Sequence, residues 1–229
     1  MNTLEMLVES GLHSTGQPLR LHLGCGQNKF KDYVNIDFPQ DRHNVMITGA
    51  DAEADIIKDL VFPENSVDEI RCHHMYEHFP RVIALAQLVK WHKWLKPEGV
   101  LVVETPDFIS SVEQLIDADY KQRMAIVRHL TGDQCEDWAF HVDQWWDERF
   151  ETTLSAFGFH VTNIKKSTWE VWPYLASVTV EAIKLNSVDI HKQIDIGLTL
   201  LKDSLVSEKE FKTFNIWKKQ FKDALKDLV

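Results

Sequence analysis

The chain has 229 residues, a formal net charge of -10 at pH 7, and 44% hydrophobic and 26% charged residues. This length and balance are typical of one globular α/β domain with room for an appendage. The acidic charge argues against a nucleic-acid partner, because binding to a phosphate backbone normally requires a basic surface.

Strand and helix patterns alternate along the first half of the chain. A short amphipathic helix is predicted over 3–12, and a second helical pattern over 80–95. Apolar runs typical of strands occupy 19–26, which ends in a glycine loop, and 33–38, 54–57, 66–72 and 100–106. Strands that alternate with helices predict a mostly parallel α/β sheet with right-handed crossovers.

The next segment is expected to complete the sheet. A helical region covers about 109–130, a Trp-rich segment follows, and a helix over 148–157 ends at Gly158. Two further strand patterns, 159–166 and 174–185, predict a long hairpin. Residues 1–186 are therefore predicted to form the main domain.

The character of the chain changes beyond Asn186, and residues 187–229 are predicted to form an appended helical hairpin. Apolar residues recur at helical spacing in two runs: Ile190, Ile194, Leu198, Leu201 and Leu205, then Phe211, Phe214, Trp217, Phe221, Leu225 and Leu228. Ser207 and Glu210 have the spacing of a capping box between them. The apolar stripe is expected to cover the main domain or a second copy of the chain, which would give a homodimer.

The cysteines and the N-terminus favour a cytoplasmic protein. Cys25, Cys72 and Cys135 are widely separated and odd in number, so no disulfide framework is expected. The first ten residues carry acids where a signal peptide would carry lysines, and no apolar run reaches the length of a membrane span.

A glycine loop marks the candidate ligand site. Gly24-Cys25-Gly26 follows the first strand, at the end of the sheet where ligands bind in open α/β folds. Asp37 ends the next strand, where a carboxylate can accept hydrogen bonds from both hydroxyls of a ribose. A dinucleotide fingerprint would need glycine at Lys29 and an acid about 20 residues on. The loop thus favours a cofactor without a pyrophosphate, although a tight strand-to-helix turn alone would also use two glycines.

Five motifs in order, LHLGCG, NID, ADIIKDLVFPENSVDEI, EHF and WLKPEGVLVVETPD, extend this pattern. Over about residues 19–107 the sequence resembles the class I S-adenosylmethionine-dependent methyltransferases, especially the bacterial type-11 group. The resemblance implies a Rossmann-like sheet of strand order 3-2-1-4-5-7-6 with an antiparallel last strand. It also implies S-adenosylmethionine as cofactor.

The resemblance assigns a role to each residue that matches a motif. Those expected at the methionine end of the cofactor are Gly24, Cys25, Gly26, Cys72 and His73. Those expected at the ribose and adenine are Asp37, Phe38, Asp59 and Leu60. In this scheme Asp59 accepts from the adenine amino group and Leu60 donates its backbone N–H.

The hexapeptide HHMYEH at 73–78 offers a competing interpretation. His74, Glu77 and His78 have the H-x-x-E-H spacing of a reversed zinc-protease signature. A zinc hydrolase also needs a third ligand, and the sequence shows no partner segment in register. We therefore expect no metal here, and we expect His78 to shape the wall of the cofactor cavity.

The acceptor side is predicted from histidines and tryptophans. A hydroxyl acceptor must lose a proton during methyl transfer, and histidine is the usual base. His141 and His74 are the candidates, with Asp143 available to orient either; the alternative is that both are half-buried structural residues. Trp138, Trp145, Trp146, Trp169 and Trp172 could stack on a ring-shaped acceptor or simply pack the helices.

The favoured function is methyl transfer to a small-molecule or glycan acceptor, most simply a hydroxyl. A cofactor-binding but non-catalytic partner subunit, and the zinc hydrolase, are the alternatives. The sequence leaves open whether oxygen, nitrogen or carbon is methylated.

Overall fold

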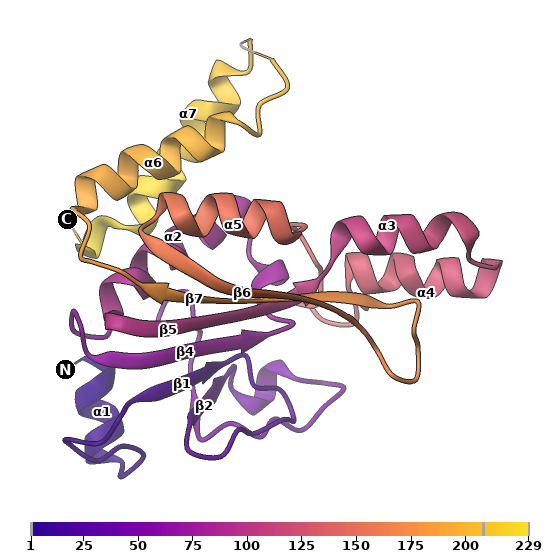
Figure 1. The fold of residues 1–229 in the computed structure, drawn as a ribbon. Helices are drawn as coiled ribbons and strands as arrows, with labels where there is room; N and C mark the ends of the chain where they lie inside the picture. The colour runs from indigo at the N-terminus through magenta and orange to yellow at the C-terminus, as the bar shows by residue number, and fades with distance from the viewer. Residues whose placement is uncertain (1, 208, 229) are drawn as a thin grey trace.

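The computed structural model describes residues 2–207 and 209–228, and its centre is a seven-stranded sheet of order β3-β2-β1-β4-β5-β7-β6 (Figure 1). The strands are β1 (Arg20–Leu23), β2 (Val34–Asp37), β3 (Ala52–Glu53), β4 (Val67–His73), β5 (Leu95–Pro106), β6 (Phe159–Thr168) and β7 (Ala176–Lys184). Strands β1 to β5 pair in parallel, whereas β7 is antiparallel to both β5 and β6. The predicted strand order and the antiparallel last strand are confirmed.

Helices flank the sheet and extend beyond it. They are α1 (Thr3–Glu9), α2 (Arg81–Trp94), α3 (Phe108–Asp117), α4 (Tyr120–Thr131), α5 (Asp147–Ala156), α6 (Ile190–Lys202) and α7 (Phe211–Ala224), with short 3-10 turns η1 (Gln40–Arg42), η2 (Tyr76–His78) and η3 (Lys226–Leu228). In Figure 1 α3 and α4 lie past the end of the sheet to which β4 points, and α6 and α7 lie over α2 and α5. No helix in the described part of the chain is long and apolar enough to cross a membrane.

Helix α2 is apolar around most of its circumference because it is covered on two sides. The sheet packs against one side, and α6 and α7 pack against the other. Val82, Leu85 and Val89 are buried, as are Trp91 and Trp94. A helix that is hydrophobic all round is expected to be enclosed in this way.

The C-terminal hairpin thus packs on its own chain. Phe221 and Leu225 belong to the same hydrophobic cluster as the residues of α2, and both are fully buried. The guanidinium of Arg81 lies 5.3 Å from the ring centroid of Trp217. The start of the stripe stays outside this contact, since Phe211 is 60% exposed.

Three local predictions differ from the structure. The third strand is found at Ala52–Glu53 rather than 54–57, and a turn follows it. The helix predicted over 109–130 is divided at Ala118, because Asp119 caps a new helix by accepting the N–H of Gln122.

The predicted capping box before α7 does not form. The hydroxyl of Ser207 accepts the N–H of Lys209, and the carboxylate of Glu210 accepts the N–H of Val206. Each side chain therefore closes a turn of the connection, and α7 begins only at Phe211.

Candidate active site

A cavity of about 310 Å³ opens at the carboxyl ends of β1, β2 and β4. This is the end of the sheet at which open α/β folds bind ligands. Its walls come from four segments: Gly24–Asn28, Asp37 and Phe38 with Met46, Asp55–Ile57, and His73–Met75 with His78, Phe79 and Trp138. Residues far apart in the sequence therefore line one cavity.

The loop after β1 needs glycine because of its backbone and its neighbours. Gly24 has φ 69° and Gly26 has φ 53°, in the left-handed region that favours glycine. A Cβ on Gly24 would lie 2.4 Å from Cγ of Met75, far inside contact distance. The loop therefore packs directly against the side chain of Met75, two residues after β4, and a residue larger than glycine would not fit at position 24.

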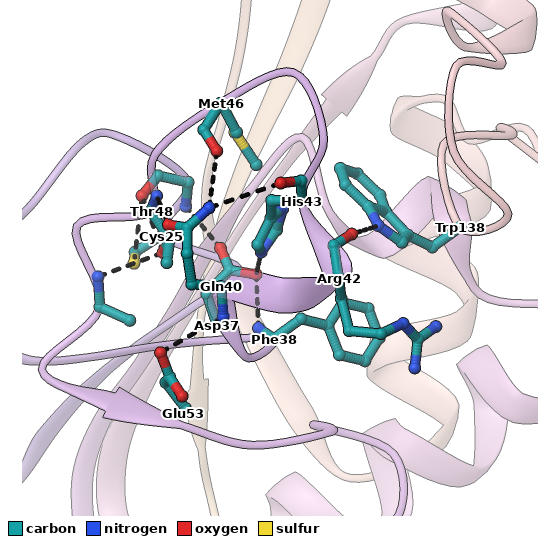
Figure 2. A network of polar contacts seen from close by, with 12 residues as sticks. Cys25, Asp37, Phe38, Gln40, Arg42, His43, Met46, Thr48, Glu53 and Trp138 are labelled. Carbon is teal, nitrogen blue, oxygen red and sulfur yellow. Dashed lines mark hydrogen bonds and ion pairs between the residues drawn. The ribbon is translucent and has the colours of Figure 1, made fainter.

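Asp37 is fixed at the cavity wall (Figure 2). Its Oδ2 accepts the N–H of Gly26 at 2.6 Å, and its Oδ1 accepts the N–H of Phe38 at 2.7 Å. Nε2 of His43 lies 3.4 Å from Oδ1. A carboxylate offers about four lone-pair sites, so these contacts orient Asp37 and still leave capacity to accept a ligand hydroxyl.

At the next wall, Trp138, from the segment after α4, meets Phe38 and Arg42 of the segment after β2. The indole Nε1 of Trp138 donates to the backbone oxygen of Arg42 at 2.9 Å. The guanidinium of Arg42 lies 4.9 Å from the ring centroid of Phe38, and the rings of Phe38 and Trp138 are 6.4 Å apart (Figure 2). This corner suits a flat, apolar group such as a nucleobase.

The structure separates the cofactor residues that the resemblance implied. Gly24, Cys25, Gly26, Asp37, Phe38 and His73 line the cavity, whereas Asp59, Leu60 and Cys72 do not. Leu60 and Cys72 are buried in the core, and the exposed Asp59 accepts the N–H of Asp55 at 2.8 Å. Because β3 ends before the predicted strand begins, Asp55, Ile56 and Ile57 reach the cavity instead.

His74 lines the cavity with an unusual backbone conformation, φ 51°. Its Nδ1 lies 3.3 Å from Oε1 of Glu77, and its Nε2 lies 3.3 Å from Oε1 of Glu104. Burial alone would lower the pKa of His74, but the two carboxylates outweigh it and raise the pKa to about 9. His74 is therefore an imidazolium at pH 7, which makes it a poor proton acceptor.

His141 lies beside the cavity and does not line it. Its Nε2 is 3.8 Å from Oε1 of Glu77. Burial lowers the pKa of His141 to about 4, although the charge of Glu77 opposes the shift. The predicted helper Asp143 pairs with Arg149 at 2.7 Å instead of orienting a histidine.

Three of the tryptophans have different surroundings: Trp138 lines the cavity, Trp169 lies behind His74, and Trp145 is in the core. Trp145 is fully buried and stacks on Phe150 with ring centroids 4.7 Å apart, so it is a core residue. Trp169 packs edge-on against His74, with centroids 5.7 Å apart. Trp138 and Trp169 are thus the indoles near the site.

Sequence reasoning missed one grouping. Glu77, His78 and His141 converge, with one potential ligand atom from each lying within 4.8 Å of the others. H-x-x-E-H signalled the first two residues, but nothing in the spacing of the sequence pointed from them to His141. The fold alone supplies that contact.

Solved structures that superpose on the chain include methyltransferases. An S-adenosylmethionine-dependent methyltransferase from Methanosarcina mazei superposes with a TM-score of 0.52 at 14% identity, covering 78% of this chain and 98% of that one. A chain of the complex between the Haloferax volcanii Trm112 methyltransferase activator and a methyltransferase gives 0.50 at 12% identity, covering 80% and 90%. No family model and no curated protein sequence matches the chain significantly.

The sheet order and these likenesses define the class: the chain has the class I S-adenosylmethionine-dependent methyltransferase fold. At the level of the fold, the resemblance that the sequence motifs indicated is confirmed.

Proposed function

We propose that the protein transfers a methyl group from S-adenosylmethionine to a small-molecule or glycan acceptor, at a hydroxyl oxygen. The observation that carries the proposal is one cavity, at the switch point of a methyltransferase sheet, that joins the glycine loop to Asp37. The glycine loop lets its own backbone come close to a ligand, and Asp37 can accept ribose hydroxyls. Phe38 and Trp138 form the apolar corner for the adenine.

In this proposal the protein mainly aligns two ligands. The cofactor carries the reactive methyl group, and transfer is an in-line displacement at the sulfonium. The acceptor would enter beside His74, which lines the cavity and packs against Glu104 on one side and the ring of Trp169 on the other. The raised pKa of His74 argues against a role as base, so in this proposal His74, held between Glu77 and Glu104, shapes the acceptor side of the cavity.

The test has two stages. Calorimetry with S-adenosylmethionine and S-adenosylhomocysteine should show one binding site per chain. Transfer of a labelled methyl group should then be measured across a library of phenols, sugars and glycans, with amines as a contrasting class. Cofactor binding with no transfer to any acceptor would favour the non-catalytic subunit, and absence of cofactor binding would refute the proposal.

A further inference from the structure

The buried carboxylate of Glu77 has one ion-pair partner, the imidazolium of His74, and accepts no hydrogen bond among the described residues. Its side chain is 1% exposed, and neither Oε1 nor Oε2 has a hydrogen-bond partner among the described residues. Nδ1 of His74 lies 3.3 Å away, at ion-pair distance but outside hydrogen-bond geometry. Burying an ion in this way costs several kcal/mol unless further groups compensate it.

Backbone carbonyls distinguish the two ring nitrogens of the neighbouring His78. Nδ1 lies 2.8 Å from the oxygen of Trp138 and 3.1 Å from the oxygen of Phe140. Since a carbonyl only accepts, Nδ1 carries a proton, and Nε2 is the ring nitrogen that can offer a lone pair to a metal ion. Metal-binding histidines typically donate their other N–H to a backbone carbonyl in this way.

His141 completes the group from a distant segment. Its Nε2 is 3.8 Å from Oε1 of Glu77, and its ring lies 4.7 Å from the ring of His78, nearly perpendicular to it. Its Nδ1 is buried without a hydrogen-bond partner among the described residues. Metal bonds of about 2.0–2.2 Å place ligand atoms roughly 3–4 Å apart, so small side-chain rotations would close the group around an ion.

The backbone holds these segments together. The N–H groups of Val142 and Asp143 donate to the oxygen of Glu77 at 2.9 and 3.3 Å. Gly132 has φ 81°, and a Cβ there would lie 2.1 Å from the oxygen of Ala139. Glycine at 132 therefore permits the close approach that brings His141 to η2.

We propose that Glu77, His78 and His141 bind one divalent transition-metal ion, such as Zn²⁺, Co²⁺ or Fe²⁺. Two imidazoles and one carboxylate are a ligand set that such ions prefer. Three protein ligands leave a position open, as in catalytic sites, and His78 also lines the cofactor cavity. The sequence predicted no metal because it showed no third ligand, and the fold brings His141 to that position.

The use of the ion rests on the proposed function. A metal ion at the open edge would bind the acceptor hydroxyl and lower its pKa, so that the proton leaves to water. The oxygen then forms a bond to the methyl carbon, the bond from that carbon to sulfur breaks, and neutral S-adenosylhomocysteine is released. This gives the acceptor a route to deprotonation that uses neither His74 nor His141 as a base.

The binding test uses the full chain stripped with EDTA and titrated with Co²⁺ or Zn²⁺ alone. We expect one equivalent per chain by calorimetry, and visible d–d absorption for bound Co²⁺. Glu77→Gln and His141→Gln should each weaken binding by more than about 100-fold, beyond the 10–100-fold loss typical of groups that only orient a ligand. His160→Gln, at an exposed histidine of β6, should bind as the wild type does.

Two results would overturn the site. One is that the wild type binds neither ion, and the other is that wild type, Glu77→Gln and His141→Gln bind with equal affinity. Circular dichroism in EDTA checks the fold of each variant, and His78→Gln replaces any variant that fails. Calorimetry of the metal-free wild type with S-adenosylmethionine, in EDTA, tests the proposed function separately. If the cofactor does not bind, the proposed function is refuted, and the result of the cation titration still decides the metal site.

Discussion

Gly197 of α6 faces the ring of Phe221 of α7 so closely that a Cβ on Gly197 would lie 2.3 Å from Cζ of Phe221. Both residues are buried, and this contact joins the two helices of the C-terminal hairpin above α2. Gly197→Leu should lower the free energy of unfolding by about 2 kcal/mol or more, because overpacking outweighs the roughly 1 kcal/mol that helix propensity adds. Urea denaturation measures the change.

The contact itself can be isolated by a double-mutant cycle. Phe221→Ala creates the space that the new side chain needs, so Gly197→Leu should cost less in that background. A coupling energy of at least about 1 kcal/mol is expected for residues in direct contact. Simple additivity would show that Gly197 is tolerated for another reason.

The glycine loop gives a second prediction. Gly24→Ala should weaken S-adenosylmethionine binding by more than about 10-fold, because the new methyl group displaces Met75 and the loop cannot keep its conformation. Gly16 is the matched control, since its φ of 85° is equally left-handed but its Cβ would meet nothing within 4 Å. If Gly16→Ala and Gly24→Ala lost affinity equally, the approach of Met75 would not be the cause.

Two acids that the sequence treated alike should behave differently. Asp37→Asn should weaken cofactor binding by about 1.5–3 kcal/mol, the range for a hydrogen bond to a charged group. Asp59→Asn should leave affinity unchanged, because Asp59 does not line the cavity. Calorimetry on both variants decides, and the reverse order of losses would favour the contacts implied by family resemblance over those of the structure.

His92 of α2 should make stability depend on pH. Burial and the nearby charge of Lys184 lower its pKa to about 4. Between pH 6.5 and 4 the unfolded chain therefore binds a proton that the folded chain does not, so stability decreases as the pH falls through this window. Across this window the free energy of unfolding should fall by about 3 kcal/mol, because a difference of one pKa unit between the folded and unfolded chain corresponds to about 1.36 kcal/mol.

Denaturation of His92→Gln at several pH values tests this. The dependence of the unfolding free energy on pH should be shallower than in the wild type between pH 6.5 and 4, while other groups titrate equally in both proteins. His160→Gln, exposed on β6, should keep the wild-type slope. An unchanged slope in His92→Gln would assign the acid sensitivity to other groups.

The sheet could be predicted because its signals are local and repeated. The apolar run at 100–106 and the glycine loop at 24–26 each mark an element by themselves, and their order in the chain indicates the topology. The short third strand was misplaced by two residues because the acids and alanines around Ala52 give no alternation to set a boundary. As a result, Asp55 lines the cavity, whereas Asp59, which was expected at the adenine, does not.

The candidate site was harder to predict because its contacts are not local. His141 reaches Glu77 only through hydrogen bonds between backbone groups of two distant segments. The protonation of His74 depends on Glu104, at the end of a neighbouring strand. Neither relationship leaves a periodicity or a spacing in the sequence. The sequence could therefore name His74 and His141 as candidate bases, but it could not show which charged groups surround them.

Trp138 has an experimental consequence of its own. The chain has eight tryptophans, but among the described residues that line the cavity Trp138 is the one indole. Its ring lies beside those of Phe38 and His43, at the corner where we propose that the adenine stacks. The difference in emission between the wild type and Trp138→Phe is therefore a built-in optical signal for occupancy of the cavity, which follows ligand arrival in real time without a label.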